Sequence, residues 1–180
     1  MKFFAALAIM LGFTVSTMAQ SAVTQNVTAN ATVQSQLVVT EIQPLEFGTV
    51  DNVVAQTKVV SPAGVASSSG GSVAQTGVQE GVGKIVRTGG IVTYKLVTPP
   101  SNLAGTAGSL LPIGSYTTAY STVTQVAAQT AGNATVTNAT SVAAGTSDIY
   151  VHIGATVTPS AATTSTGTHT AEITLSAEYN

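Results

Sequence analysis

Apolar and polar residues alternate along the segment from Val23 to Val39. The odd positions read V, Q, V, A, A, V, S, L and V, and the even positions are polar up to Gln36. Because successive side chains of a β-strand point to opposite faces, this segment predicts a strand with one apolar and one polar face. It would span roughly 58 Å, whereas globular strands commonly have about five or six residues. One domain can hardly use so long a strand, so its N-terminal part is suited to complete the sheet of another molecule.

The first residues carry the three parts of a secretory signal peptide. Met1-Lys2 is a short basic n-region, Phe3 to Val15 is an apolar h-region, and Thr17-Met18-Ala19 resembles the cleavage site that follows it. We expect cleavage after Ala19, so that residues 1–19 form the leader. The apolar run is shorter than the roughly 20 residues that span a bilayer. The sequence therefore predicts a secreted protein with no membrane span in its mature chain, and the periplasm is the alternative location.

The composition is poor in charge and rich in residues that favour strands. Only 7% of the residues are charged, the formal net charge is −2, and 44% are hydrophobic. This charge offers no basic surface for nucleic acid, and the apolar content argues against disorder. The chain has no Cys, so an exported fold must rely on its core and its sheet hydrogen bonds instead of disulfides. Such a composition is typical of a β-rich extracellular protein and not of an enzyme.

Short strand patterns follow one another along the mature chain, separated by turns of Gly, Ser and Thr. The predicted strands are Ser35–Thr40, Leu45–Val50, Lys58–Ser61, Gly83–Thr88, Ile91–Thr98, Ser121–Ala127, Ile149–Thr158 and Thr170–Tyr179. In the last two, the apolar residues share one face, as they do in antiparallel sheets that cover a core on one side. Seven or eight such strands predict an all-β fold over residues 35–180, an immunoglobulin-like antiparallel β-sandwich.

Two turn signals refine this prediction. Gly89-Gly90 lies between two strand patterns and predicts a short hairpin, because both glycines accept a positive φ. Pro99-Pro100 follows the second of these patterns. We expect the strand to end there, because proline has no N–H to donate to a ladder.

Residues that could carry catalysis or hold a metal are few. His152, His169 and Asp148 could be imagined as a zinc site, but no pair of them has the spacing of metal ligands. We expect the two histidines to be exposed residues on polar faces. No Gly-x-Ser-x-Gly turn is present for a nucleophilic serine. The sequence thus predicts no catalytic residues, no cofactor and no metal.

Three stretches together carry the pattern of a family. They are the alternating N-terminus leading into Leu45–Val50, then Gly83–Gly90 with Val92, Tyr94 and Leu96, and finally Ile149–Val157 with Gly167 and Ile173–Tyr179. In these stretches the chain resembles the secreted bacterial family called domain of unknown function 4402, which is similar in layout to spore-coat-U-like and chaperone–usher pilin subunits. The family tends to have a paired glycine where this chain has Gly154-Ala155. The resemblance implies a β-sandwich and a role in a fibre or at the cell surface, and it implies no activity.

Pilins of the chaperone–usher kind lack one strand of their core and accept it from the N-terminus of the next subunit, which is a form of strand addition. The resemblance therefore makes residues 20–34 a donor-strand extension. The side chains expected to insert are Val23, Val27, Ala29, Ala31 and Val33, while the Thr and Asn residues between them stay in water. Gln25 interrupts the apolar row and is expected at the mouth of a pocket. Burial of the five apolar side chains would contribute roughly 5–7 kcal/mol.

Two functions remain open from the sequence. If insertion joins subunits head to tail without closing a ring, it produces a homopolymer. The first hypothesis is therefore a structural subunit of an extracellular fibre or pilus, with a periplasmic chaperone and an outer-membrane usher as candidate assembly partners. The alternative is a self-complete, monomeric β-sandwich, secreted or periplasmic, that acts in binding or adhesion. In that case Val23 to Val39 is one long, bent first strand.

Overall fold

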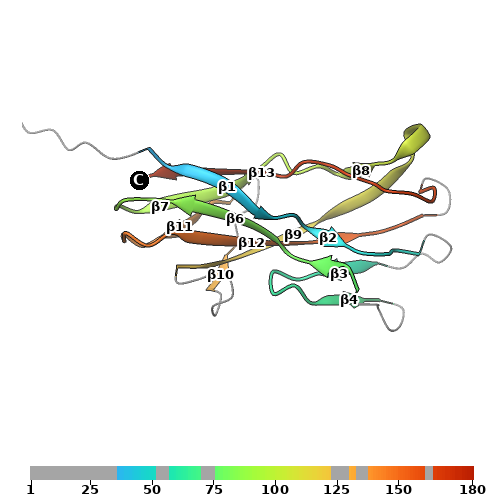
Figure 1. The fold of residues 1–180 in the computed structure, drawn as a ribbon, viewed down its shortest axis with the longest axis horizontal. Coiled ribbons are helices and arrows are strands. Elements are labelled where there is room, and N and C mark those ends of the chain that lie inside the picture. The colour runs from blue at the N-terminus through green and yellow to red at the C-terminus, as the bar shows by residue number, and fades with distance from the viewer. Residues whose placement is uncertain (1–35, 52–56, 70–75, 123–129, 133–137, 161–163) are drawn as a thin grey trace, which may run out of the picture. The chain divides into compact units, whose positions relative to one another are not determined.

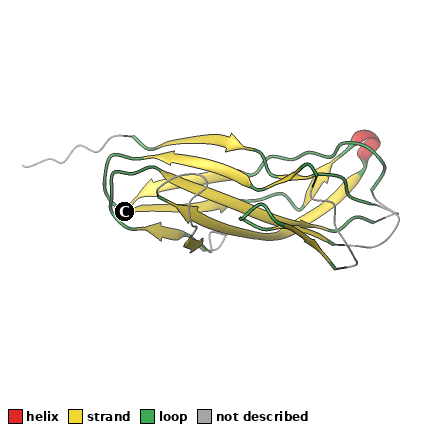
Figure 2. Ribbon diagram, turned by 60° about the horizontal axis from the view of Figure 1, so that its bottom comes forward, coloured by secondary structure: helices red, strands yellow, loops and turns green. Residues whose placement is uncertain are grey.

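β-Strands dominate the part of the chain that the computed structural model describes, which comprises residues 36–51, 57–69, 76–122, 130–132, 138–160 and 164–180. These residues belong to one compact unit, Val33–Asn180. They contain thirteen strands and one short 3-10 turn, Thr106–Gly108. Within them, no helix is long and apolar enough to cross a membrane. The predicted all-β class is confirmed (Figures 1 and 2).

The strands in chain order are β1 (Val38–Gln43), β2 (Glu46–Phe47), β3 (Lys58–Val60), β4 (Ala66–Ser68), β5 (Val78–Gln79), β6 (Gly81–Val86), β7 (Val92–Val97), β8 (Asn102–Ala104), β9 (Leu110–Ser121), β10 (Thr130–Gly132), β11 (Thr140–Val142), β12 (Ile149–Val157) and β13 (Thr174–Tyr179). Seven of them have only two or three residues. Two of these, β2 and β3, lie within predicted strands. The other five were not predicted, because segments so short carry little alternation for a sequence pattern to detect, and the described residues therefore hold more strands than the seven or eight expected.

Two larger sheets share the core. In the eight-stranded sheet, β12 lies at the centre, with β6 and β3 on one edge and β9 on the other, and β1 pairs with β6. The three-stranded sheet has the order β11-β7-β13. Every ladder is antiparallel. One buried cluster combines side chains of both sheets, namely Ile85, Val92, Tyr94, Leu96, Val142, Ile149, Val151 and Ile153. The two sheets therefore face each other across a shared core, as in a sandwich.

The apolar face predicted for β12 is confirmed by burial, but the wet opposite face is not, because His152 and Gly154 are buried there as well. Ile149, Val151, Ile153, Ala155 and Val157 are all at most 7% exposed and face the core. On the other face, Tyr150 and Thr156 are half-buried. This central strand thus supplies the floor of the core along its whole length.

The Gly89-Gly90 turn does not make a hairpin. It joins β6 to β7, and these strands belong to different sheets, so the predicted hairpin is wrong. The buried Arg87 holds the turn in place, because its Nε donates to the carbonyl of Ser147 at 2.8 Å and its Nη1 donates to that of Ala143 at 2.7 Å. A Gly-Gly pair marks a reversal of the chain but not whether the next strand pairs or crosses to another layer.

The longest strand was not predicted. β9 contains Pro112 and Gly114, which weaken any strand pattern. It nevertheless pairs with β12 over most of its length and with β8 near its start. Of the strand expected at Ser121–Ala127, residues 123–127 lie outside the described part. By contrast, β7 ends at Val97, just before Pro99-Pro100, as predicted.

Candidate strand-accepting groove

The described strands leave β1 and β13 with one ladder neighbour each. β1 pairs with β6, and β13 pairs with β7, in two different sheets. The two strands run in opposite directions near each other (Figure 1). The last predicted strand was expected to begin at Thr170, but β13 begins only at Thr174. Before it, among the described residues, Thr170 forms one isolated bridge with Ala104. Exposed strand edges offer backbone N–H and C=O groups to an additional strand.

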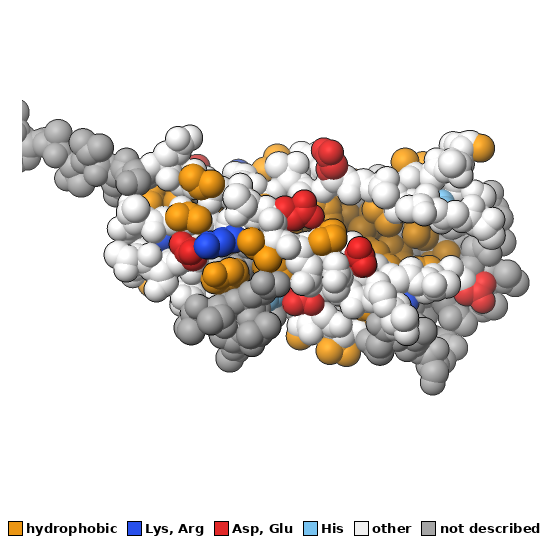
Figure 3. Space-filling view, viewed as in Figure 1, with side chains coloured by type: hydrophobic (Ala, Val, Ile, Leu, Met, Phe, Trp, Pro, Cys, Tyr) orange, Lys and Arg blue, Asp and Glu red, His pale blue; other side chains and the backbone are white. Residues whose placement is uncertain are grey.

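A groove opens between the segments that contain β1 and β13. It encloses about 1260 Å³ and is bounded by Val39–Asp51, its first wall, and by Thr164–Leu175, its second wall. Its apolar lining includes Leu45, Phe47, Leu103, Leu111, Ile113, Ile153, Ile173 and Leu175. In the space-filling view, hydrophobic side chains gather in a hollow with acidic side chains around it (Figure 3). The groove is therefore an opening onto the core and not a polar surface cleft.

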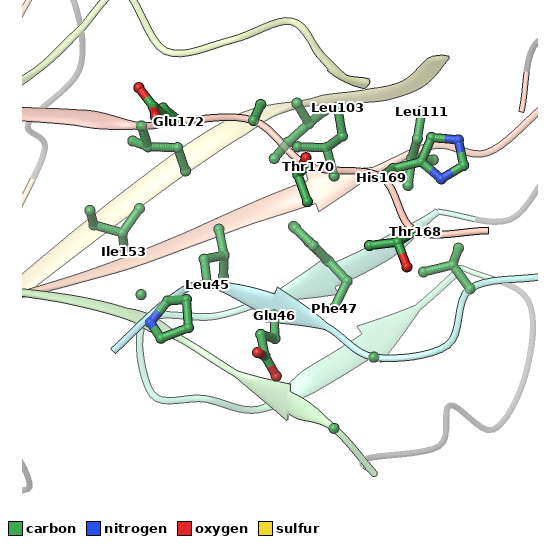
Figure 4. A pocket seen from close by; sticks show the side chains of 18 of the residues that line it. Leu45, Glu46, Phe47, Leu103, Leu111, Ile153, Thr168, His169, Thr170 and Glu172 are labelled. Carbon is green, nitrogen blue, oxygen red and sulfur yellow. The ribbon is translucent and has the colours of Figure 1, made fainter. Parts of the chain in front are cut away.

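The side chains on the two walls point in alternating directions. Leu45 and Phe47 project into the groove towards Thr170, whereas Glu46 points away from it (Figure 4). Glu172, on the opposite wall, also points away from the groove (Figure 4). Phe47 is 8% exposed and belongs to the second core cluster, with Val60, Leu111, Ile113, Ala155 and Val157. The groove is thus lined by the inner faces of strands that already contribute to this core.

Two glycines of β6 let both walls approach this strand. A Cβ on Gly83 would lie 2.6 Å from Cδ2 of Leu175, and a Cβ on Gly81 would lie 3.1 Å from Cβ of Leu45. Carbon atoms in contact normally stay about 3.5–4.0 Å apart. Leu175 and Leu45 therefore pack in the space that two side chains of β6 would otherwise fill, and the groove between the walls takes its shape from this packing.

The first wall changes partners at a β-bulge. The register between β1 and β6 shifts between Glu41 and Gln43. Nε2 of Gln43 then donates to the carbonyl of Glu80 at 2.9 Å. Pro44 follows and has no N–H for the ladder. Beyond the bulge the wall continues as β2, which pairs with β5. A bulge of this kind bends the strand, so the wall leaves β6 while still facing the groove.

The second wall is anchored by Ser109, which precedes β9. The N–H of Ser165 donates to Oγ of Ser109 at 2.7 Å, and the same Oγ lies 2.7 Å from Nε2 of His169. Nδ1 of His169 lies 3.1 Å from the carbonyl of Gly167. Because a carbonyl can only accept, Nδ1 carries the proton, and Nε2 accepts the hydrogen bond of the Ser109 hydroxyl. Thr170 and Ala104 exchange two further backbone bonds of 2.9 and 2.8 Å.

Charge on the groove has one sign. Among the described residues that line it, Glu41, Glu46, Asp51 and Glu172 are acidic, and none is Lys or Arg. The segment 20–34 has no charged residue at all. No side-chain charge of this segment is therefore complementary to the groove, and its insertion would depend mainly on apolar burial and backbone pairing.

The histidines do not occupy the positions expected of them. His152 is fully buried instead of exposed on a polar face, so that prediction is wrong. Its Nδ1 lies 3.5 Å from Oε1 of Glu80, and burial lowers its pKa below the ordinary value, although Glu80 acts in the opposite direction. His169 is half-buried against Ser109. Asp148 pairs with Lys84 at 2.7 Å. His152, His169 and Asp148 therefore contact different partners and do not form one site. Within the described ranges, no group of three potential metal ligands exists.

The predicted donor residues Val23, Val27, Ala29, Ala31 and Val33 all lie outside the described residues. The sequence predicts this donor segment, but it gave no prediction of the groove. The groove brings together residues far apart in the chain, from Leu45 to Leu175. One local signal for it exists, because the pair Gly81 and Gly83 removes two side chains from the core face of a buried strand. Such a pair marks a close approach of other parts of the chain.

Comparison with known proteins gave no match to a family model, to a curated protein or to a solved structure. The resemblance to the family called domain of unknown function 4402 therefore stays a prediction.

Proposed function

We propose that this protein is the structural subunit of an extracellular fibre that assembles by donor-strand complementation. In this assembly the segment Val23–Val33 of one subunit occupies the groove of the next. The observation that carries the proposal is the groove itself, which has an apolar floor and lies between strands with one described ladder neighbour each. A strand placed there can pair with the backbone on either side and bury its inward side chains.

The length of the donor segment suits the groove. Val23–Val33 has eleven residues, close to the thirteen of the wall from Val39 to Asp51. At about 3.3 Å per residue, an extended segment of this length spans roughly 36 Å. Its inward row of valines and alanines matches the apolar lining in character. Its outward row of Thr and Asn would replace the opening of the groove with a polar surface.

The geometry also suits growth of a polymer. The donor and the groove are different surfaces of the same chain, so each contact is heterologous and leaves one donor and one groove open at the two ends. A fibre follows if the contact does not close into a ring. Secretion, display at the cell surface, and help from a periplasmic chaperone and an outer-membrane usher belong to the same proposal, and they rest on the leader and on the family resemblance.

A matched pair of substitutions in the mature chain tests the proposal. Val27→Asp places a charge on the inserting row, whereas Thr28→Asp places the same charge on the row that faces water. We expect Val27→Asp to leave monomers and Thr28→Asp to assemble, as seen by light scattering and electron microscopy. Circular dichroism of both variants checks that the sandwich still folds.

Two results would contradict the proposal. One is assembly of the Val27→Asp chain that equals that of the Thr28→Asp chain. The other is an unsubstituted mature chain that stays monomeric at high concentration, which would favour the self-complete binding or adhesion protein instead.

A further inference from the structure

One acidic side chain lies on the inner row of a groove wall. Glu41 pairs with Gly83 in the ladder between β1 and β6, and Val39 pairs with the buried Ile85. Directly opposed residues of a ladder share one face of the sheet. The face of Gly83 is the inner one, because a Cβ there would meet Leu175. Glu41 therefore stands on the same face as Val39, and it lines the groove.

The donor segment has one polar residue in its inward row. The other inward positions are Val23, Val27, Ala29, Ala31 and Val33, and the exception is Gln25. An apolar strand laid over Glu41 would remove water from its carboxylate and provide no side-chain hydrogen bond in return, which is costly. The amide of Gln25 has two N–H donors and can satisfy this carboxylate.

We propose that Gln25 of one subunit donates a hydrogen bond to Glu41 of the next subunit, and that this pair sets the register and direction of the inserted strand. The inference rests on the function proposed above. With Gln25 beside Glu41, the residues up to Val33 stay within the groove only if the donor runs parallel to β1 and antiparallel to β13, because β1 begins at Val38. Val23 then lies beside Val39, and Ala29 lies in the stretch where Leu45 and Phe47 project into the groove.

The ends of the groove support the same direction. β1 begins at the end of the groove where β6 and β13 finish, as the hydrogen bond from the N–H of Thr88 to Oη of Tyr179 shows. The described part of the accepting subunit therefore begins at this end, with Gln36. A donor parallel to β1 continues into its own sandwich at the opposite end, near Asp51 and Thr168. In the reverse direction, the donor would leave through the end at which the acceptor's own described chain begins.

Disulfide trapping can test the register, because the chain has no Cys of its own. Mature chains carrying Val23→Cys and Val39→Cys, one substitution per chain, keep Gln25 and Glu41 in place and are co-assembled so that a mixed disulfide must join two molecules. Neighbouring strands bring Cα atoms about 5 Å apart, which suits a disulfide. We expect this pair to form the most mixed disulfide on a non-reducing gel. Thr24→Cys, on the outward row, serves as the control with Val39→Cys.

A third donor variant separates the outcomes. If Val33→Cys links to Val39→Cys more than Val23→Cys does, the strand runs in the reverse direction, and the Gln25–Glu41 pair is wrong while strand insertion stands. If fibres form and neither donor position links to Val39→Cys, the register is wrong. If the unsubstituted chain does not assemble at all, the proposed function itself fails.

An energetic cycle gives an independent readout. We expect Gln25→Val to raise the concentration needed for assembly roughly 10- to 100-fold, because Glu41 is then covered without a donor. The double variant Gln25→Val with Glu41→Val should assemble within a few-fold of the unsubstituted chain, since neither charge nor amide remains. The pairing is contradicted if Gln25→Val alone assembles as readily as the unsubstituted chain.

Discussion

Gly154 in β12 is the position where a single methyl group should disturb this fold most clearly. A Cβ there would lie 2.8 Å from the carbonyl carbon of Ser61 and 2.9 Å from Cδ of Pro62, and it would also contact the carbonyl oxygen of Val60. These are atoms of the backbone and of a proline ring, so no flexible side chain can move aside. Because carbon atoms in contact stay about 3.5–4.0 Å apart, β3 would have to shift by roughly 0.7–1 Å.

The cost of Gly154→Ala follows from this shift. Overpacking of a core costs about 1–3 kcal/mol. Weakening one bond of the ladder between β12 and β3 adds about 1 kcal/mol. Alanine recovers about 0.5–1 kcal/mol, because glycine loses more backbone entropy on folding. We therefore expect the free energy of unfolding to fall by about 1–3.5 kcal/mol, which lowers the melting temperature by roughly 2–14 °C in a protein of this size.

Gly114 in β9 is the matched control. It lies opposite Thr156 of β12, and a Cβ there would meet nothing within 4 Å. We expect Gly114→Ala to be neutral or to stabilise the protein by up to about 1 kcal/mol. Urea unfolding followed by circular dichroism, at one protein concentration for all variants, measures both. The reasoning is refuted if Gly154→Ala unfolds within about 0.5 kcal/mol of the unsubstituted chain, or if Gly114→Ala loses as much stability.

Two further substitutions test the second groove wall and the buried histidine. Ser109→Ala removes the partner of both Ser165 and His169, so we expect a loss of about 1–2 kcal/mol and faster amide exchange in residues 165–170; unchanged exchange there would show that Ser109 does not anchor the wall. Burial lowers the pKa of His152, so the folded protein binds its proton less readily than the unfolded chain does. The stability due to the neutral imidazole is present above the unfolded pKa, near 6.5, and is lost as the pH falls below it. His152→Leu should therefore flatten the decline in unfolding free energy between pH 7 and pH 5, and an unaltered slope would contradict this assignment.

The sequence was most informative where one element has a regular period. In β12, the odd positions from Ile149 to Val157 were expected on one face, and burial confirms this. The end of β7 before Pro99 was also predictable, since proline affects the ladder locally. The predicted exposure of His152 was wrong. Its place on the polar face of the strand does not show which other parts of the chain lie against that face, and here Glu80 does.

The candidate site was predictable only in part. The alternation of Val23–Val33 is visible in one contiguous stretch, so a strand that inserts elsewhere can be inferred from it. The groove depends on residues separated by more than a hundred positions, such as Leu45 and Leu175, which both pack on β6 because Gly81 and Gly83 have no side chains. The glycine pair is visible in the sequence, but no local pattern shows which distant residues fill the space above it.

The sequence by itself determined the all-β class, the apolar face of the central strand and the presence of an overlong N-terminal alternation. These properties follow from the two-residue period of strands, which nearby residues express directly. Only the tertiary structure decided that β6 and β7 lie in different sheets, and that β1 and β13 border an apolar groove. It did so because long-range packing selects which faces meet, and in this protein that packing leaves a groove in which the inner row carries Glu41.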